Sequence, residues 1–137
     1  TLRRSSAASD VYKRQNDGKN KYLIYGIENR IEQIIANLLD NAISFSDDNK
    51  DVIVQVSKSE DNKVYIKILD EGQGFKEKDT NKIFKRFYSN RPDKFGQHSG
   101  LGLNIVKNLV DLHNATIKAT NRQDKKGASM EIEFPKV

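Results

Sequence analysis

Hydrophobic and polar positions alternate along the chain in two patterns, one with helical and one with strand spacing. Apolar side chains recur every three to four positions in residues 27–46, which begin "IENRIEQ", and again in 100–113, so both stretches are predicted to be amphipathic helices. Runs rich in β-branched and aromatic residues predict strands at 21–26, 52–59, 63–70, 115–121 and 128–135. The order strand, helix, hairpin, polar segment, helix, hairpin predicts an α/β (α+β) two-layer sandwich, with a mixed β-sheet covered on one face by helices.

The polar segment between the two hairpins is the longest part of this region without a regular pattern. Residues 76–99 contain an aromatic cluster, "IFKRFY" (83–88), and a break at Pro92. A segment of this length with little regular structure is uncommon in a small domain and is often a functional lid. We therefore predict a mobile lid over residues 75–99. The aromatic cluster itself has two interpretations, because its helix-like spacing is also typical of core packing.

Composition places the chain among globular proteins and argues against several other classes. Its 137 residues are 36% hydrophobic and 31% charged, and none is cysteine, which excludes disulfides and cysteine-based metal sites. The net charge of +5 falls to +2 once residues 1–15 are set aside, because four basic residues and one acidic residue give that stretch +3. A nearly balanced domain is weak support for a nucleic-acid surface, so we expect no nucleic-acid partner.

Residues 1–15, "TLRRSSAASDVYKRQ", differ in character from the rest of the chain. They are small, polar and aperiodic, and they are similar to vector- or adaptor-derived translations found at the ends of assembled sequences. We expect this stretch to be a non-native or disordered leader, and we expect the folded domain to occupy 16–137.

Amide side chains line one face of the first predicted helix. Gln33, Asn37 and Asn41 are spaced by four residues and therefore lie side by side beside the apolar stripe. A solvated helix face would explain the pattern. Alternatively, an amide oxygen could ligate Mg²⁺, a hard ion that shares the rest of its coordination shell with water and phosphates.

The motif "DEGQG" (70–74) follows the second strand of the first predicted hairpin. Asp70 ends that strand, and Gly72 and Gly74 allow a tight turn or the close approach of a flat ligand. An ordinary Asp-Gly turn is one interpretation. The other is a buried carboxylate that accepts a hydrogen bond from an exocyclic amine such as that of adenine.

A glycine-rich start characterises the second predicted helix, which opens with "HSGLGLNIVK" (98–107). Gly100 and Gly102 lie where free N–H groups and the helix dipole favour a phosphate. The motif is neither a Rossmann fingerprint nor a P-loop. His98 and His113 have no ligand-like spacing, so we expect no transition-metal site.

These motifs occur in one order, and together they resemble the catalytic ATP-binding domain of two-component sensor histidine kinases. That domain belongs to a superfamily shared with gyrase B, Hsp90 and MutL. The resemblance covers residues 22–137: "NLLDNAISFS" (37–46) resembles the N box, "DEGQG" the G1 box, "IFKRFY" the F box, "HSGLGLNIVK" the G2 box and "GASMEIEFP" (127–135) the G3 region. It implies the Bergerat ATP-binding fold with ATP and Mg²⁺ as cofactors.

The resemblance also implies roles for individual residues. Asn41 would ligate Mg²⁺, Asn37 would lie near the phosphates, and Asp70 would bind adenine. The other implied nucleotide contacts come from the G1, F and G2 boxes and are Gly72, Gly74, Phe84, Phe87, Gly100, Leu101, Gly102 and Leu103. Ser44 and Ser89 stand where many relatives carry cations, so Arg86 or Arg91 is expected to supply the missing catalytic charge.

The resemblance further predicts what surrounds the domain. Neither histidine lies in a phosphoacceptor-like box, so the γ-phosphoryl group would go to a histidine on a dimerisation domain absent from this chain. The family's first strand is expected to be missing. We expect a monomeric isolated domain, a homodimeric parent with a cognate response regulator, and a cytoplasmic location beneath an inner-membrane anchor. An anti-sigma-factor-type serine kinase, an ATP-hydrolysing relative and a non-catalytic nucleotide-sensing module are the alternatives.

Overall fold

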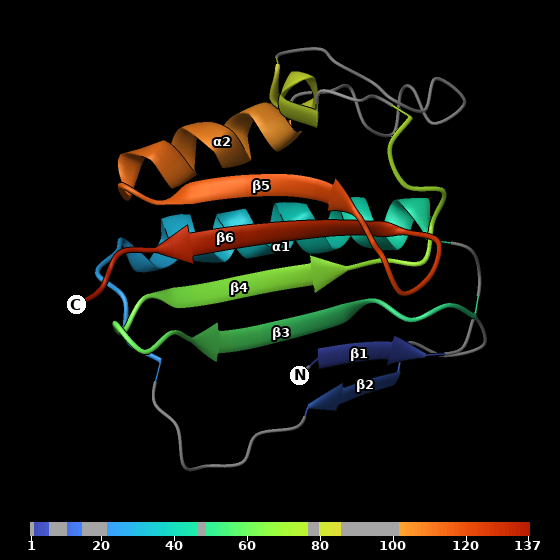
Figure 1. Ribbon diagram of the computed structural model, residues 1–137, viewed down its shortest axis with the longest axis horizontal. Helices are drawn as coiled ribbons and strands as arrows, with labels where there is room; N and C mark the ends of the chain where they lie inside the picture. Colours follow the sequence, from blue (N-terminus) through green and yellow to red (C-terminus); the bar gives the residue numbers. More distant parts are fainter. Residues whose placement is uncertain (1, 6–10, 15–21, 47–48, 77–79, 86–101) are drawn as a thin grey trace.

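The structure is a computed structural model, and it describes residues 2–5, 11–14, 22–46, 49–76, 80–85 and 102–137. Figure 1 shows a sheet with helices on one side. In chain order the elements are β1 (Leu2–Ser5), β2 (Val11–Arg14), α1 (Glu28–Phe45), β3 (Ile53–Lys58), β4 (Val64–Leu69), the 3-10 helix η1 (Thr80–Phe84), α2 (Gly102–Leu112), β5 (Thr116–Asn121) and β6 (Ala128–Phe134).

The sheet has the strand order β2-β1-β3-β4-β6-β5, and every neighbouring pair that the structure describes is antiparallel. The prediction of a two-layer α/β fold is confirmed, but the prediction of a mixed sheet is wrong. β4 and β5 do run in the same direction, as Figure 1 shows. However, β6 lies between them. After α2 the chain enters the sheet at its outer edge as β5, and β6 then folds back into the position between β5 and β4.

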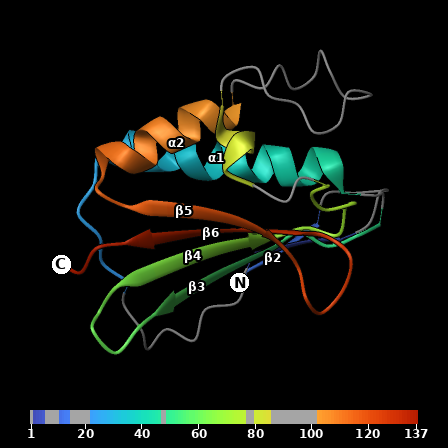
Figure 2. The same ribbon diagram turned by 45° about the horizontal axis from the view of Figure 1, so that its top comes forward.

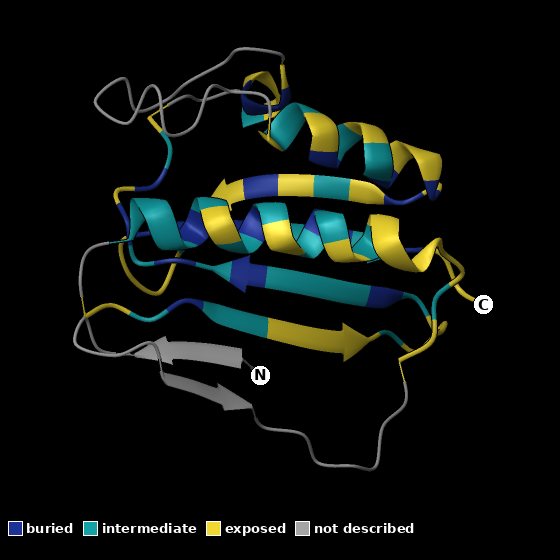
Figure 3. Cartoon of the chain, turned by 180° about the vertical axis from the view of Figure 1, so that it is seen from behind, coloured by how far each residue is buried: buried dark blue, intermediate teal, exposed yellow. Residues whose placement is uncertain are grey.

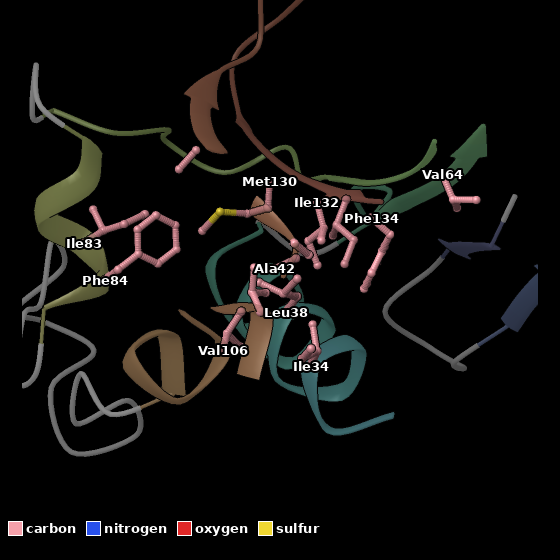
Figure 4. Close-up of a cluster of buried hydrophobic side chains, with 14 of the residues drawn as sticks. Ile34, Leu38, Ala42, Val64, Ile83, Phe84, Val106, Met130, Ile132 and Phe134 are labelled. Atoms are coloured by element: carbon pink, nitrogen blue, oxygen red, sulfur yellow. The ribbon is translucent and has the colours of Figure 1, made fainter. Parts of the chain in front are cut away.

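One face of the sheet forms the core with the two helices, which lie above it as a second layer in Figure 2. The register pairs the apolar residues of β4 and β6 directly: Val64 with Phe134, Ile66 with Ile132, and Ile68 with Met130. The helices add buried side chains that are one turn apart, as the close-up in Figure 4 shows. These are Ile34, Leu38 and Ala42 from α1, and Val106 and Val110 from α2.

The opposite face of the sheet is polar. The Tyr65 hydroxyl donates to the Glu133 carboxylate at 2.6 Å, and Lys67 forms an ion pair with Glu131 at 3.5 Å. Figure 3 shows the same alternation of buried and exposed positions along β5. The period-two pattern therefore directs the apolar side chains toward the helices.

Residues 22–27 do not form the strand predicted at 21–26. They pair with no described strand, and the Ile27 N–H donates to Nε2 of His113 at 3.1 Å. Gly26 lies against Ile31 and His113, and Tyr25 is exposed. The apolar residues that suggested a strand therefore lie in an irregular segment, which contacts the end of α2 through His113.

Residues 1–15 contain two strands, whereas the sequence predicted no regular structure there. β1 and β2 form an antiparallel hairpin, and β1 pairs with β3 through Leu2–Val54 and Arg3–Ile53. An open sheet edge presents unpaired N–H and C=O groups to which an extended segment can bind, which explains this placement. The prediction that residues 1–15 are a non-native leader stays a prediction. No helix in the described part of the chain is both long and apolar enough to cross a membrane.

Candidate nucleotide-binding site

The elements that carry the predicted motifs converge at one end of the molecule. Figures 1 and 2 place the end of α1, the end of β4 and the beginning of β6 together, with η1 and the start of α2 on the same side. Segments more than 50 residues apart in the chain meet here, since the Ala128 N–H reaches the Asp70 carboxylate 58 positions away.

Asp70 follows β4 directly, and the residue is only 4% exposed. Its Oδ1 accepts from the Gly72 N–H at 2.9 Å and from the Ala128 N–H at 3.0 Å. No donor from the described residues reaches Oδ2. A buried carboxylate oxygen without a donor is costly unless a ligand supplies one, so Oδ2 is the natural acceptor for a bound amine.

Backbone contacts hold the "DEGQG" loop against its neighbours, and two glycines make these contacts possible. A Cβ at Gly72 would lie 2.4 Å from the Phe45 carbonyl oxygen at the end of α1. A Cβ at Gly127 would lie 2.0 Å from the Asp70 carbonyl oxygen. The sequence left a tight turn and the close approach of a flat ligand as the two interpretations of Gly72, and the contact with Phe45 supports the first, because the protein's own backbone requires a glycine there.

The amide-bearing helix ends beside this loop. Besides the contact at Gly72, the Glu71 N–H donates to Ser46 Oγ at 3.2 Å, which joins the loop to the C-cap of α1. Asn41 lies one turn before Phe45, and Asn37 lies one turn earlier; both are partly exposed. Asn37 and Asn41 therefore lie on the helix that borders the buried carboxylate.

The aromatic cluster is in part a packing element. Ile83 and Phe84 in η1 are 1% and 6% exposed and belong to the core (Figure 4). The Phe84 carbonyl accepts from Asn104 Nδ2 at 3.2 Å, which fixes η1 to α2. Phe84 thus matches the packing interpretation, and its implied nucleotide contact stays a prediction. Several other predicted site residues lie outside the described residues: Arg86, Phe87, Arg91, Gly100 and Leu101.

The first two residues of α2 differ in burial: Gly102 is exposed, and Leu103 packs against the core. Gly102 is the first helical residue and is exposed. Apart from its chain neighbours and the backbone of its own helix, no atom of the described residues lies within 4 Å of a Cβ built on it. Leu103 is partly buried against the core. Packing of Leu103 against the core holds this end of the helix in place, and among the described residues no side chain covers the surface at Gly102.

Two charged groups next to the site were missed by the sequence analysis. Glu71 accepts from the Asp51 N–H at 2.8 Å and from Lys125 Nζ at 3.1 Å, and the Asp51 hydrogen bond lowers the pKa of Glu71. Arg122 binds Asp124 through Nε at 3.0 Å and Nη2 at 2.7 Å. Glu71 lies inside the "DEGQG" motif, but neither its type nor its position there indicates a role, and Arg122 lies in a polar stretch that a solvated loop would explain equally well.

Acidification is expected to release the Arg122–Asp124 pair only well below neutral pH. The hydrogen bonds from Arg122 lower the pKa of Asp124 from 3.8 to about 2. A carboxyl with a lowered folded-state pKa stabilises the fold fully above pH 3.8, and this contribution is lost as the pH falls toward 2. A carbon-13 NMR titration of the Asp124 carboxyl should show this midpoint. A midpoint near 3.8, or one that does not move when Arg122 is replaced by alanine, would contradict the pairing.

Comparison with known proteins gives the family. The model of the family described as "Histidine kinase-, DNA gyrase B-, and HSP90-like ATPase" matches residues 26–137. Sensor protein ChvG of Agrobacterium fabrum is 36% identical over 130 residues, covering 93% of this chain and 22% of the relative. Sensor histidine kinase WalK of Bacillus subtilis is 33% identical over 112 residues, covering 79% of this chain and 18% of the relative. The chain therefore spans about a fifth of the length of these curated relatives.

Solved structures agree with this family. The mycobacterial sensor histidine kinase MprB superposes with a TM-score of 0.75 at 25% identity, covering 82% of this chain and 76% of that one. The catalytic domain of histidine kinase ThkA gives a TM-score of 0.72 at 27% identity, covering 86% and 76%. Together with the buried Asp70 carboxylate beside α1, these matches show that the chain belongs to the histidine kinase-, DNA gyrase B- and HSP90-like ATPase family, as an ATP-binding catalytic domain of the sensor histidine kinase type.

Proposed function

We propose that this domain binds Mg·ATP between α1, the Asp70 loop and the start of α2, and donates the γ-phosphoryl group to a histidine on a dimerisation domain. The observation that carries the proposal is the buried Asp70 carboxylate, whose Oδ1 is held by two backbone N–H groups while no described donor reaches Oδ2. Adenine presents an amine that this oxygen can accept from, whereas guanine presents a carbonyl at that position.

The remaining parts of the nucleotide would extend from Asp70 toward the two helices. Asn41, with Asn37 near the phosphates, would hold Mg²⁺ through its amide oxygen, and the described residues contain no cluster of three or more carboxylates or histidines that would form an all-protein cage. Such a site suits Mg²⁺, which usually takes few protein ligands beside water and phosphate oxygens. When bound, the ion would neutralise charge that develops on the transferred group.

The helix terminus and the lid segment would complete the phosphate site. The N–H groups of Gly102 and Leu103 lie in the first turn of α2, where they have no acceptor within the helix, and they can donate hydrogen bonds to an anion. Arg86 or Arg91 would add the cation that Ser44 and Ser89 do not provide. Because the chemistry of phosphoryl transfer needs mainly positioning and charge stabilisation, this set requires no general base on the domain.

The acceptor histidine would come from another domain. Nε2 of His113 accepts from the Ile27 N–H, Nδ1 lies 2.7 Å from the Leu109 carbonyl oxygen, and the residue is only 9% exposed. Both ring nitrogens are therefore engaged in holding the end of α2. The parent would be a homodimer, anchored in the inner membrane with this domain on its cytoplasmic side, that passes the phosphoryl group to a response regulator.

Phosphotransfer in trans tests this proposal. With γ-labelled ATP, we expect acid-labile label on an added histidine-bearing helical hairpin, and none on the isolated chain. Asn41→Ala should weaken Mg²⁺-dependent ATP binding by roughly 10–100-fold, a loss typical even of groups that only support a metal ligand. Gln33→Ala, two turns earlier on the same helix face, is the matched control and should bind as the wild type does.

Three results would contradict the proposal. Acid-stable label would indicate transfer to serine, as in the anti-sigma-factor alternative. Label on the isolated chain would mean that the acceptor has been misassigned. ATP affinity that is the same with Mg²⁺ and with a chelator would remove the role given to Asn41.

A further inference from the structure

Asn121, the last residue of β5, and Arg122, which follows it, contact the two ends of the segment 70–75. Nη1 of Arg122 donates to the Asp70 carbonyl oxygen at 3.1 Å. Oδ1 of Asn121 accepts from the Phe75 N–H at 2.6 Å, and its Nδ2 donates to the Phe75 carbonyl oxygen at 3.0 Å. The segment that begins with the adenine-binding carboxylate and ends where the lid segment starts is therefore held at its two termini by neighbouring residues.

The Asn121 contact reproduces the hydrogen bonds of a neighbouring strand. An asparagine amide offers one acceptor and one donor group, and here they meet the N–H and the C=O of the same residue. Gly74, just before Phe75, has φ +76°, and a Cβ there would lie 2.6 Å from Asn121 Oδ1. The backbone thus turns so that it admits the Asn121 side chain.

The Arg122 contact ties Asp70 to the turn between β5 and β6. The Arg122 side chain is 4% exposed. Asp124 accepts from its Nε and Nη2, which leaves Nη1 to donate to the Asp70 carbonyl oxygen. The Arg122 N–H donates to the Gly127 carbonyl at 2.9 Å, and the next residue, Ala128, donates its N–H to Asp70 Oδ1. The carbonyl and the carboxylate of Asp70 are thus both held by one turn.

We propose that Asn121 and Arg122 are positioning residues of the nucleotide site. Neither contacts the nucleotide; together they fix the orientation of the Asp70 carboxylate relative to the start of the lid segment at Phe75. This inference rests on the proposed adenine-binding role of Asp70. It predicts that loosening either contact reduces ATP binding through Asp70 and leaves binding that does not use Asp70 unaffected.

Calorimetry with Mg·ATP and Mg·GTP on the whole chain tests the inference, with thermal melting as a parallel measurement. Asn121→Ala removes both hydrogen bonds to Phe75. Arg122→Lys keeps the charge but loses the planar fork that serves Asp124 and Asp70 together. We expect each to weaken ATP binding roughly tenfold, the order expected from one or two lost hydrogen bonds, and to leave GTP binding as it is.

The ATP-to-GTP ratio separates positioning from stability. A variant that only destabilises the fold lowers the affinity for both nucleotides in proportion, whereas a displaced Asp70 carboxylate lowers the ratio. Thr120→Ala, at the exposed preceding position on β5, is the matched control and should keep the wild-type ratio. Should Asn121→Ala not fold, Asn121→Asp decides in the same assay, because it has the same shape and replaces the donor to the Phe75 carbonyl with a charged oxygen that repels it.

The outcomes distinguish this inference from the proposed function. Wild-type ATP affinity and ratio in the Asn121 and Arg122 variants, with weak binding in Asp70→Asn, would overturn the positioning role alone. Equal ATP binding by wild type and Asp70→Asn, or no binding by either, would overturn the adenine assignment and this inference with it.

Discussion

Asp70→Asn is expected to weaken ATP binding by roughly 10–100-fold while the domain stays folded. A loss of this size corresponds to one hydrogen bond to a charged group. An asparagine of the same shape can keep Oδ1 as the acceptor for the Gly72 and Ala128 N–H groups. Its amide nitrogen then replaces Oδ2 and faces the adenine amine, so two donors oppose each other. The substitution therefore changes the ligand-facing atom and preserves the protein-facing one.

Calorimetry with ATP and GTP provides the measurement. Because guanine presents a carbonyl oxygen, the asparagine variant should lose affinity for ATP and gain relative preference for GTP. Glu71→Gln is the control: it makes the same carboxylate-to-amide change at the next residue, whose contacts are with Asp51 and Lys125. If Asp70→Asn binds ATP as tightly as Glu71→Gln does, Oδ2 is not the adenine acceptor.

Local periodicity was enough to predict most of the elements. The helix predicted at 27–46 is Glu28–Phe45, and the hairpin predicted at 115–121 and 128–135 is Thr116–Asn121 and Ala128–Phe134. Strand pairing depends on contacts distant in sequence, and there the predictions failed. The sequence did not show that β6 would lie between β4 and β5. It also did not show that residues 22–27 would contact His113 instead of forming a strand.

The same distinction applies to the site. Asp70 and its glycines form a contiguous motif, so the sequence was sufficient to select them. Asn121 and Arg122 reach their partners 46 and 52 positions away, and nothing in a short polar turn distinguishes them from solvated residues. Phe84 shows the reverse case: it lies inside a recognisable motif, yet its side chain packs in the core.

Gly127→Ala is expected to destabilise the fold by about 3 kcal/mol or more, from backbone strain together with a steric overlap in a packed region. Gly127 has φ +146°, and an added Cβ would lie 2.0 Å from the Asp70 carbonyl oxygen and 2.9 Å from its carbon. Both are backbone atoms, so no side-chain rotation can relieve the overlap. Either the β5–β6 turn or the Asp70 loop has to move, and the hydrogen bond from Ala128 to Oδ1 is lost with it.

Thermal and urea unfolding measure the loss, and Gly102→Ala provides the control. Nothing among the described residues lies within 4 Å of a Cβ at Gly102, so its stability should change by no more than about 0.5 kcal/mol. A folded Gly127→Ala variant with wild-type stability would show that the turn has room that the structure does not provide.

Gly127 and Gly102 are expected to be glycines for different reasons, the first for the fold and the second for the ligand. Gly127 is required because one part of the backbone approaches another, whereas at Gly102 the described protein atoms give no such reason. Its reason would be the phosphate at the start of α2, where a methyl group would stand between the anion and the free N–H groups. Gly102→Ala should therefore keep its stability and lose affinity for ATP more than for adenosine, which has no phosphates. Equal losses for ATP and adenosine, or none for either, would mean that Gly102 does not serve the phosphates.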